Sequence, residues 1–403
     1  MKKKVMWTII LPFLLILIFG SYSYAVQFST KVLDQVYAAD FLKINETGMA
    51  VWESEDDRED IFLYDNSRDQ IIKLKAGFNT SDKAPDINKF GDVVWADTDP
   101  VSDGGGIYFY NYSDGTISSI GGSGFYDAWY PQINSQRNIV WQGYDGSDYE
   151  IFFYDGMNII QLTNNSYDDL YPQINDQNSI LWQGSDGTDF EIFLYKDSFT
   201  TQLTDNSFDD TSAVMNENGA AAWMGFDGND NEIFYYDGLN VTQLTDNLLV
   251  DESPVINNQG SVVWFEGGDS ITTFDDLEVC LYDGLTINQI TDDNDYDDFS
   301  PYINDNGEIV WTSQQRNFPY YSDIYYSDGT MIQQISTIYN NNSFPAISNS
   351  GNVVWFSTDQ YGNQYVNYAE KISEPVPEPS SLFLMGGGFL LIISLRLNRK
   401  RKY

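Results

Sequence analysis

The sequence predicts an all-β fold in which about eight small, four-stranded sheets pack against one another in a ring. The evidence is a repeat of 41 to 47 residues, short apolar runs typical of strands, and turn residues between the runs. Such a period is typical of β-propeller blades or of helical arrays, so the local pattern has to distinguish them. A tryptophan that closes the second apolar run marks each copy: Trp52, Trp95, Trp141, Trp182, Trp223, Trp264, Trp311 and Trp355.

The first half of each copy reads as two strands joined by a tight turn. Asparagine lies seven residues before the tryptophan in seven copies, with Ser348 in the eighth, and proline lies ten residues before it in six. Glycine lies four residues before it, replaced in two copies by Arg137 and Asn178. The asparagine side chain starts turns by hydrogen-bonding to the backbone a few residues further on, and glycine or asparagine adopts the positive φ that turns often require. Arg137 is an exception to this pattern.

The second half of each copy predicts two more strands. A variable loop precedes a run such as residues 150–154 (EIFFY), an Asp-Gly turn and a short run ending in Gln-Leu-Thr. No window remains for an amphipathic helix. The runs are apolar on both faces, so both faces of each sheet must be buried. In a ring of blades, each sheet is buried between its two neighbours. An open stack of hairpins is the alternative, and it would need capping units.

The two ends of the repeat array complement each other. The last copy lacks the Gln-Leu-Thr strand, and a spare β-compatible segment, residues 30–34 (TKVLD), precedes the first copy. We therefore expect this segment to supply the fourth strand of the last blade and to close the ring. The ring is assigned to residues 26–372.

The repeat resembles the WD40-like β-propeller repeat of the TolB-type family. In that family Pro-x-x-Asn-x-x-Gly precedes an apolar strand, an Ile-Phe/Tyr strand and a Leu-Thr ending, as in residues 131–163 and 172–204 here. The likeness extends over about residues 40–370. It implies a propeller that commonly has six blades, whereas eight units are counted in this sequence, so six and seven blades remain alternatives.

Residues 1–25 read as a secretory signal peptide. Three lysines precede an apolar run from about Val5 to Phe19. In residues 23–25 (SYA), Ser23 and Ala25 are small residues at the positions that a signal peptidase recognises. We expect an N-terminal signal helix and cleavage after Ala25. A permanent N-terminal membrane anchor is the alternative.

Composition excludes several kinds of site. The chain has no histidine and a single cysteine, Cys280, so zinc sites built on these residues and catalysis by Ser-His-Asp or Cys-His are excluded. Cys280 stands where other copies have phenylalanine, and we expect a buried apolar side chain. With 60 acidic and 20 basic residues, the protein repels nucleic acid and anionic lipid surfaces.

The composition changes abruptly near the C-terminus. Residues 373–381 form a Pro-rich linker, residues 382–395 are apolar, and residues 396–403 are basic. A short apolar helix followed by a basic cluster is typical of a membrane stop whose positive end stays in the cytoplasm. This order of parts resembles the PEP-CTERM sorting signal, with the motif at Val376, Pro377, Glu378 and Pro379.

The PEP-CTERM resemblance implies processing by an exosortase in a Gram-negative bacterium and delivery to the cell surface or an exopolysaccharide matrix. The expected partners are signal peptidase, an exosortase-type enzyme and, for the ring, exopolysaccharide or a surface protein. Membrane contact is expected only through the terminal segments. A plain C-terminal membrane anchor is the alternative.

Carboxylates are the reactive groups that the composition leaves. The pattern Asp-Gly-x-Asp-x-Glu recurs between the second and third strands of three copies, and three oxygen donors in six residues suit a hard cation such as Ca²⁺. Asp-Gly is also an ordinary hairpin turn, so a metal site and a simple turn both remain open. Asp-Asp pairs before the first strand (Asp168-Asp169, Asp209-Asp210, Asp297-Asp298) read as solvated loop charge. The candidate metal ligands are Asp145, Asp148, Glu150, Asp186, Asp189, Glu191, Asp227, Asp230 and Glu232.

No catalytic residue is assigned. A glycosidase uses two carboxylates at a fixed separation, but an active site usually breaks the symmetry of a repeat, and here the acids recur from copy to copy. We therefore expect a non-catalytic binding or structural protein of the cell surface or extracellular matrix. The alternatives are a carboxylate-dependent polysaccharide hydrolase or lyase and a TolB-like periplasmic interaction protein.

Overall fold

The computed structural model describes residues 26–37, 39–55, 59–74, 82–97, 106–120, 127–267, 276–293, 295–317, 321–336 and 340–372. Regular structure in these ranges is β-strand throughout, and they contain no helix long and apolar enough to cross a membrane. The predicted signal peptide, sorting motif, C-terminal apolar segment and basic tail lie outside the described residues. Phe28–Ile372 forms one compact unit.

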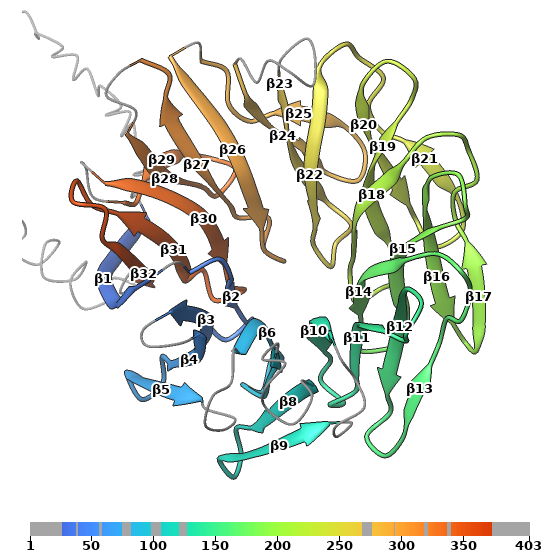
Figure 1. Ribbon diagram of the computed structural model, residues 1–403. Coiled ribbons are helices and arrows are strands. Elements are labelled where there is room, and N and C mark those ends of the chain that lie inside the picture. The colour runs from blue at the N-terminus through green and yellow to red at the C-terminus, as the bar shows by residue number, and fades with distance from the viewer. Residues whose placement is uncertain are drawn as a thin grey trace, which may run out of the picture. The chain divides into compact units, whose positions relative to one another are not determined.

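Six sheets of the described chain contain four antiparallel strands each, in sequence order (Figure 1). They are β2 (Leu42–Ile44), β3 (Ala50–Glu55), β4 (Glu59–Asp65) and β5 (Gln70–Leu74); β6 (Asp82–Ile87), β7 (Val93–Asp97), β8 (Gly106–Asn111) and β9 (Thr116–Ile120); β10 (Trp129–Ile133), β11 (Ile139–Tyr144), β12 (Tyr149–Tyr154) and β13 (Ile159–Gln161); β14 (Asp169–Ile174), β15 (Ile180–Ser185), β16 (Phe190–Lys196) and β17 (Phe199–Gln202); β18 (Asp210–Met215), β19 (Ala221–Phe226), β20 (Asn231–Tyr236) and β21 (Val241–Gln243); β22 (Val250–Ile256), β23 (Val262–Gly267), β24 (Glu278–Tyr282) and β25 (Ile287–Gln289).

A further sheet has eight strands and divides into two halves of four. One half is β26 (Tyr296–Ile303), β27 (Ile309–Gln315), β28 (Ser322–Ser327) and β29 (Ile332–Gln334); the other is β30 (Asn341–Ile347), β31 (Val353–Thr358), β32 (Gln364–Ile372) and the N-terminal β1 (Gln27–Val36). A single parallel pair, Ser322 with Asn341, joins the two halves. The prediction of an all-β protein made of four-stranded sheets is confirmed, and so is the pairing of the N-terminal segment with the last repeat, because β1 hydrogen-bonds to β32.

The repeated tryptophans lie between neighbouring sheets. Each is at most 2% exposed. Trp141 stacks on Phe152 of the adjacent strand, with ring centroids 5.8 Å apart, and packs against Val94 and Ala96 of the preceding sheet. Cys280 is buried in a cluster of the same kind, as predicted. Because large aromatic side chains provide most of the buried apolar area, each sheet depends on both of its neighbours.

The last and first sheets share a core, which closes the succession of sheets into a ring. Val366 and Tyr368 of β32 pack with Trp52 of β3, and Val36 of β1 joins the same cluster. The hydroxyl of Tyr368 donates a hydrogen bond to the carbonyl of Gly48 at 3.2 Å. Figure 1 shows the blue strand β1 beside β32.

A set of buried asparagines, here called the asparagine ring, links consecutive sheets. Asn257 Oδ1 accepts hydrogen bonds from the backbone N–H groups of Gln259 and Ser261 at 3.1 and 2.9 Å, which closes the predicted turn. Its Nδ2 donates to the carbonyl of Asn304 in the next sheet at 3.0 Å. The other members, each donating to the following repeat, are Asn45, Asn88, Asn134, Asn175, Asn216 and Asn304. Ser348, the equivalent residue of the last repeat, has no side-chain amide and cannot donate this hydrogen bond.

Arg137 takes the turn position that glycine fills in most copies. Its φ of 67° lies in the left-handed region, which is disfavoured for a residue with a Cβ atom. The Arg137 Nε lies 2.9 Å from Asp92 Oδ2. This ion pair to the preceding sheet offsets the backbone strain, and the sequence pattern alone does not reveal it.

Candidate functional site

The acidic loops join the second and third strands of three consecutive sheets. In the first of them, Asp145 Oδ1 accepts hydrogen bonds from the Ser147 backbone N–H at 2.9 Å and from its hydroxyl at 2.8 Å. The backbone N–H of Asp145 donates to the Asp148 carbonyl at 3.1 Å, and Gly146 has a φ of 115°. The tight turn expected from Asp-Gly is therefore present.

Glu150 lies on β12 opposite Gly143 of β11 and is 0% exposed. Its Oε1 accepts a hydrogen bond from the Asn165 backbone N–H at 2.7 Å, whereas its Oε2 is buried without a hydrogen-bond partner in the described structure. Burial raises the pKa of Glu150 to about 7, because removing a carboxylate from water disfavours its charged form.

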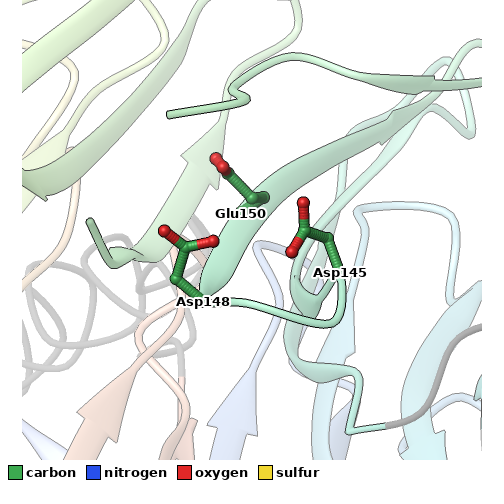
Figure 2. A group of neighbouring side chains, drawn as sticks. All are labelled: Asp145, Asp148 and Glu150. Atoms are coloured by element: carbon green, nitrogen blue, oxygen red, sulfur yellow. The ribbon is translucent and has the colours of Figure 1, made fainter. Parts of the chain in front are cut away.

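The structure brings the predicted acidic side chains together. Asp145, Asp148 and Glu150 each offer a carboxylate oxygen, and these oxygens lie within 4.8 Å of one another (Figure 2). The next sheet repeats the arrangement with the second predicted set: Asp186, Asp189 and Glu191.

The third loop departs from the prediction in one ligand. Asp227 and Glu232 cluster with Asp246 instead of Asp230. Asp246 follows the Gln-Leu-Thr strand, so it reaches the loop from a different part of the repeat, and the motif by itself does not identify it. Asp230 is nevertheless buried, and no group in the described chain hydrogen-bonds to its Oδ1.

The second acidic set is not uniformly solvated. Asp168 is exposed, but Asp169 is 3% exposed and accepts a hydrogen bond from Trp182 Nε1 at 2.8 Å. Asp210 does the same for Trp223 at 3.0 Å, and burial raises its pKa to about 7. The reading as loop charge is therefore wrong for the second aspartate of each pair. A signal was present in the sequence, since Asp or Asn lies 13 residues before the tryptophan in six copies.

Glycines opposite the buried glutamates make room for these aspartates. A Cβ atom at Gly184 would overlap Asp169 Oδ1, and one at Gly225 would overlap Asp210 Oδ1. Gly184 and Gly225 are therefore required by the buried aspartate of the same sheet, whereas a Cβ atom at Gly143 would meet Phe152.

The first strands of the sheets line a cavity of about 500 Å³. Two ion pairs lie along its wall: Lys43 Nζ is 2.8 Å from Asp86 Oδ1, and Lys89 Nζ is 2.9 Å from Asp176 Oδ2. Lys89 belongs to the second sheet and Asp176 to the fourth, so their ion pair spans the intervening third sheet.

An aromatic cluster lies where these first strands begin. The rings of Tyr130 and Tyr171 have centroids 4.9 Å apart, and Tyr130 also lies 6.1 Å from Phe41 and 6.1 Å from Trp129. Tyr130 and Tyr171 have φ values of 50° and 52°, although each precedes a proline. The same position has a positive φ in five other repeats, at Ala84, Ser212, Ser253, Ser300 and Phe344, beside a register shift in the first strand. The conformation is therefore a β-bulge of the repeat. Tyr171 is half exposed.

Comparison with solved structures identifies the fold. The β-propeller domain of the trilobed protease from Pyrococcus furiosus is 11% identical, with 75% of this chain and 99% of that one covered and a TM-score of 0.53. Oligogalacturonate lyase from Vibrio parahaemolyticus is 11% identical, with 88% and 98% covered and a TM-score of 0.50. A protein assigned as TolB from Agrobacterium tumefaciens is 16% identical over 55% of this chain and 90% of its own, with a TM-score of 0.41.

These identities establish likeness of fold alone. No curated protein matches the sequence. The described residues have the architecture of a β-propeller, and residues 375–400 match the PEP-CTERM protein-sorting motif.

Proposed function

We propose that this chain is an exported, non-catalytic propeller of eight blades that is sorted to the cell surface or extracellular matrix and binds exopolysaccharide there. The observation that carries the proposal is the match of residues 375–400 to the sorting motif, because such a motif implies export and processing by an exosortase-type enzyme. The blade count is supported by the division of the eight-stranded sheet into two halves of four strands.

The aromatic cluster supports binding of a polysaccharide. Aromatic rings present flat apolar faces, and the C–H faces of sugar rings stack on such surfaces. Tyr171 is half exposed and its ring lies against that of Tyr130 at an interplanar angle of 51°, so the two rings offer neighbouring, inclined faces. Gln132 and Gln173, which line the adjoining cavity, offer amide groups for hydrogen bonds to sugar hydroxyls.

The carboxylates support a structural role better than a catalytic one. The same buried pair, an Asp that binds the tryptophan and a Glu opposite glycine, recurs in the fourth and fifth sheets. A hydrolase or lyase would need one pair of carboxylates that differs from the equivalent pairs in the other repeats and faces a substrate groove. A polysaccharide hydrolase or lyase is nevertheless the second candidate function, because an oligogalacturonate lyase is among the proteins of similar fold.

One assay separates the two candidates. The full-length chain, purified in detergent, is incubated with exopolysaccharide from the producing cells, and bound protein, reducing ends and unsaturated ends are measured in the same tube. Co-sedimentation without new chain ends is the expected result, and release of reducing or unsaturated ends would instead establish the enzyme. Tyr171→Ala should weaken binding at least tenfold, whereas Tyr361→Ala, at a tyrosine that is 81% exposed and outside the cluster, should not.

The sorting step has its own measurement. The intact mass of the protein recovered from the cell surface should lack residues 382–403. A surface protein that retains this segment would contradict processing, and it would leave the binding assay unaffected.

A further inference from the structure

We propose that the acidic loops of the third, fourth and fifth sheets are three Ca²⁺ sites that stabilise the rim of the ring, independently of what the propeller binds. The sites are, in order, Asp145, Asp148 and Glu150; Asp186, Asp189 and Glu191; and Asp227, Glu232 and Asp246. In each, three carboxylate oxygens lie within 4.8 Å of one another, close enough to bind one ion together.

The glutamate of each site points to a missing ligand. Glu150, Glu191 and Glu232 are all 0% exposed, and in all three the Oε2 atom has no hydrogen-bond partner within the described chain. A buried polar atom left unsatisfied is costly, and more so when it carries charge. Glu278 of the sixth sheet shares this unpartnered Oε2, but among the described residues only the three proposed sites bring two further carboxylate oxygens within 4.8 Å. The buried glutamate and the clustered oxygens together argue for a shared ligand.

A protein cation sits at the corresponding place in the first sheet. Asp60 there pairs with Ser54 as Glu150 pairs with Gly143. Lys73 Nζ, from the fourth strand, lies 2.7 Å from Asp60 Oδ2. The ammonium group thus supplies in this repeat the positive charge that the acidic sites lack.

The sixth sheet shows the same substitution with arginine. Asp276 lies two residues before Glu278, as Asp148 lies two before Glu150. Arg316 Nη1 is 3.0 Å from Asp276 Oδ1, and its Nε is 3.2 Å from Asp297 Oδ1. The first sheet therefore pairs its buried carboxylate with a cation from within the chain. In the sixth sheet Arg316 pairs with two aspartates, Asp276 and Asp297, while Glu278 Oε2 keeps no hydrogen-bond partner in the described chain.

Within the described ranges, no ion pair involves a carboxylate of the three proposed sites. Between positions 127 and 267 the sequence has two basic residues, Arg137 and Lys196, against 24 acidic ones. Arg137 pairs with Asp92. Lys196 ends β16, whereas Glu191 lies near its start, about 16 Å away along the backbone at the rise of an extended strand.

Calcium fits the donor set better than other common cations. The donors are all carboxylate oxygens, aspartates from loops and a glutamate from the third strand of each sheet, and Ca²⁺ accepts six to eight oxygens in flexible geometry, with water completing the shell. Mg²⁺ requires a stricter octahedron. Three carboxylates and an open loop are typical of the weaker, extracellular class of calcium site.

The test uses the full-length chain in detergent, stripped with EDTA and titrated calorimetrically with CaCl₂ and, separately, MgCl₂. We expect about three Ca²⁺ ions per chain and a melting temperature that rises by about 5 °C at ten times the dissociation constant. The triple variant Glu150→Gln, Glu191→Gln and Glu232→Gln should lose this binding and this rise. Glutamine keeps the Oε1 that accepts the backbone hydrogen bond, and each single variant should remove one ion.

The matched control removes the same number of charges from neighbouring Asp-Gly turns. Asp155→Asn, Asp237→Asn and Asp283→Asn alter residues that accept turn hydrogen bonds and lie outside the proposed sites. This control should bind as the wild type does. The proposal is overturned if CaCl₂ gives neither heat nor a melting shift in the wild type. It is also overturned if the control loses Ca²⁺ binding as the glutamine variant does, or if MgCl₂ gives an equal response that survives in the glutamine variant. Either of these two results would indicate diffuse attraction of counterions to the acidic chain.

Discussion

Replacing Asn257 with serine should remove one link of the asparagine ring while leaving its turn in place. Ser348 shows that a serine at this position still accepts a hydrogen bond from the backbone N–H four residues on, where Asn352 N lies 3.0 Å from Ser348 Oγ. The bond lost is the 3.0 Å donation from Asn257 Nδ2 to the Asn304 carbonyl. The substitution therefore isolates the contact between two sheets from the turn within one.

The expected cost follows from what remains at the acceptor. A neutral hydrogen bond contributes about 0.5–1.5 kcal/mol, and the Asn304 carbonyl keeps a second donor, the Gly307 backbone N–H at 3.0 Å. The loss of buried side-chain volume adds a fraction of this, so the free energy of unfolding should fall by about 1–2 kcal/mol. At about 2.1 cal/mol/K of unfolding entropy per residue, the melting temperature of a ring of this size should fall by about 2 °C.

Urea unfolding followed by tryptophan fluorescence measures this change, because every repeat buries a tryptophan. The matched control is Asn240→Ser in the exposed turn between β20 and β21, whose Nδ2 lies 3.4 Å from Asp237 Oδ2 within the same turn. An unchanged unfolding midpoint for Asn257→Ser, or an equal loss in the control, would refute the role of the asparagine ring.

Three further predictions concern closure and charge. Deleting residues 26–36 should cause a large fall in melting temperature, because β1 is the fourth strand of the last repeat; an unchanged melting curve would reject this role. Ser348→Asn should raise the free energy of unfolding by about 1 kcal/mol by giving the Asn45 carbonyl a second donor, and a loss of stability would show that the junction has a different geometry. Burial raises the pKa of Glu278 to about 7 and of Asp298 to about 6. The folded state therefore holds these protons more tightly than the unfolded chain, so stability should be full below about pH 4 and decline as the pH rises to about 7; Glu278→Gln should reduce this slope, and an equal slope in the variant would contradict it.

The sequence pattern predicted the strands and the turns because both depend on nearby residues. Asparagine seven residues before tryptophan predicts a turn, and the structure has that turn, but the second function of Asn257 depends on a carbonyl 47 residues away. No local pattern encodes that distance. The position of β1 was predictable because a missing strand and a spare strand are both visible in the sequence.

The candidate site was predicted less completely. Two of the three acidic loops assemble as expected, because their ligands lie on one hairpin. Asp246 was missed because it approaches the third loop from the far end of the repeat. The burial of Asp169 was missed because acidic pairs usually indicate solvated loops, although its fixed spacing from Trp182 was available as a signal.

The junction between β32 and the first sheet is expected to form after the junctions between consecutive repeats. Tyr368 and Gly48 are 320 residues apart, and joining such distant points costs entropy that nearby contacts do not. Every other junction joins consecutive repeats and can form while the chain is still emerging. The final junction must wait until β32 has been delivered, three residues before the matched segment that starts at 375. A product cut short anywhere before this point lacks both the closing junction and the segment that matches the sorting motif.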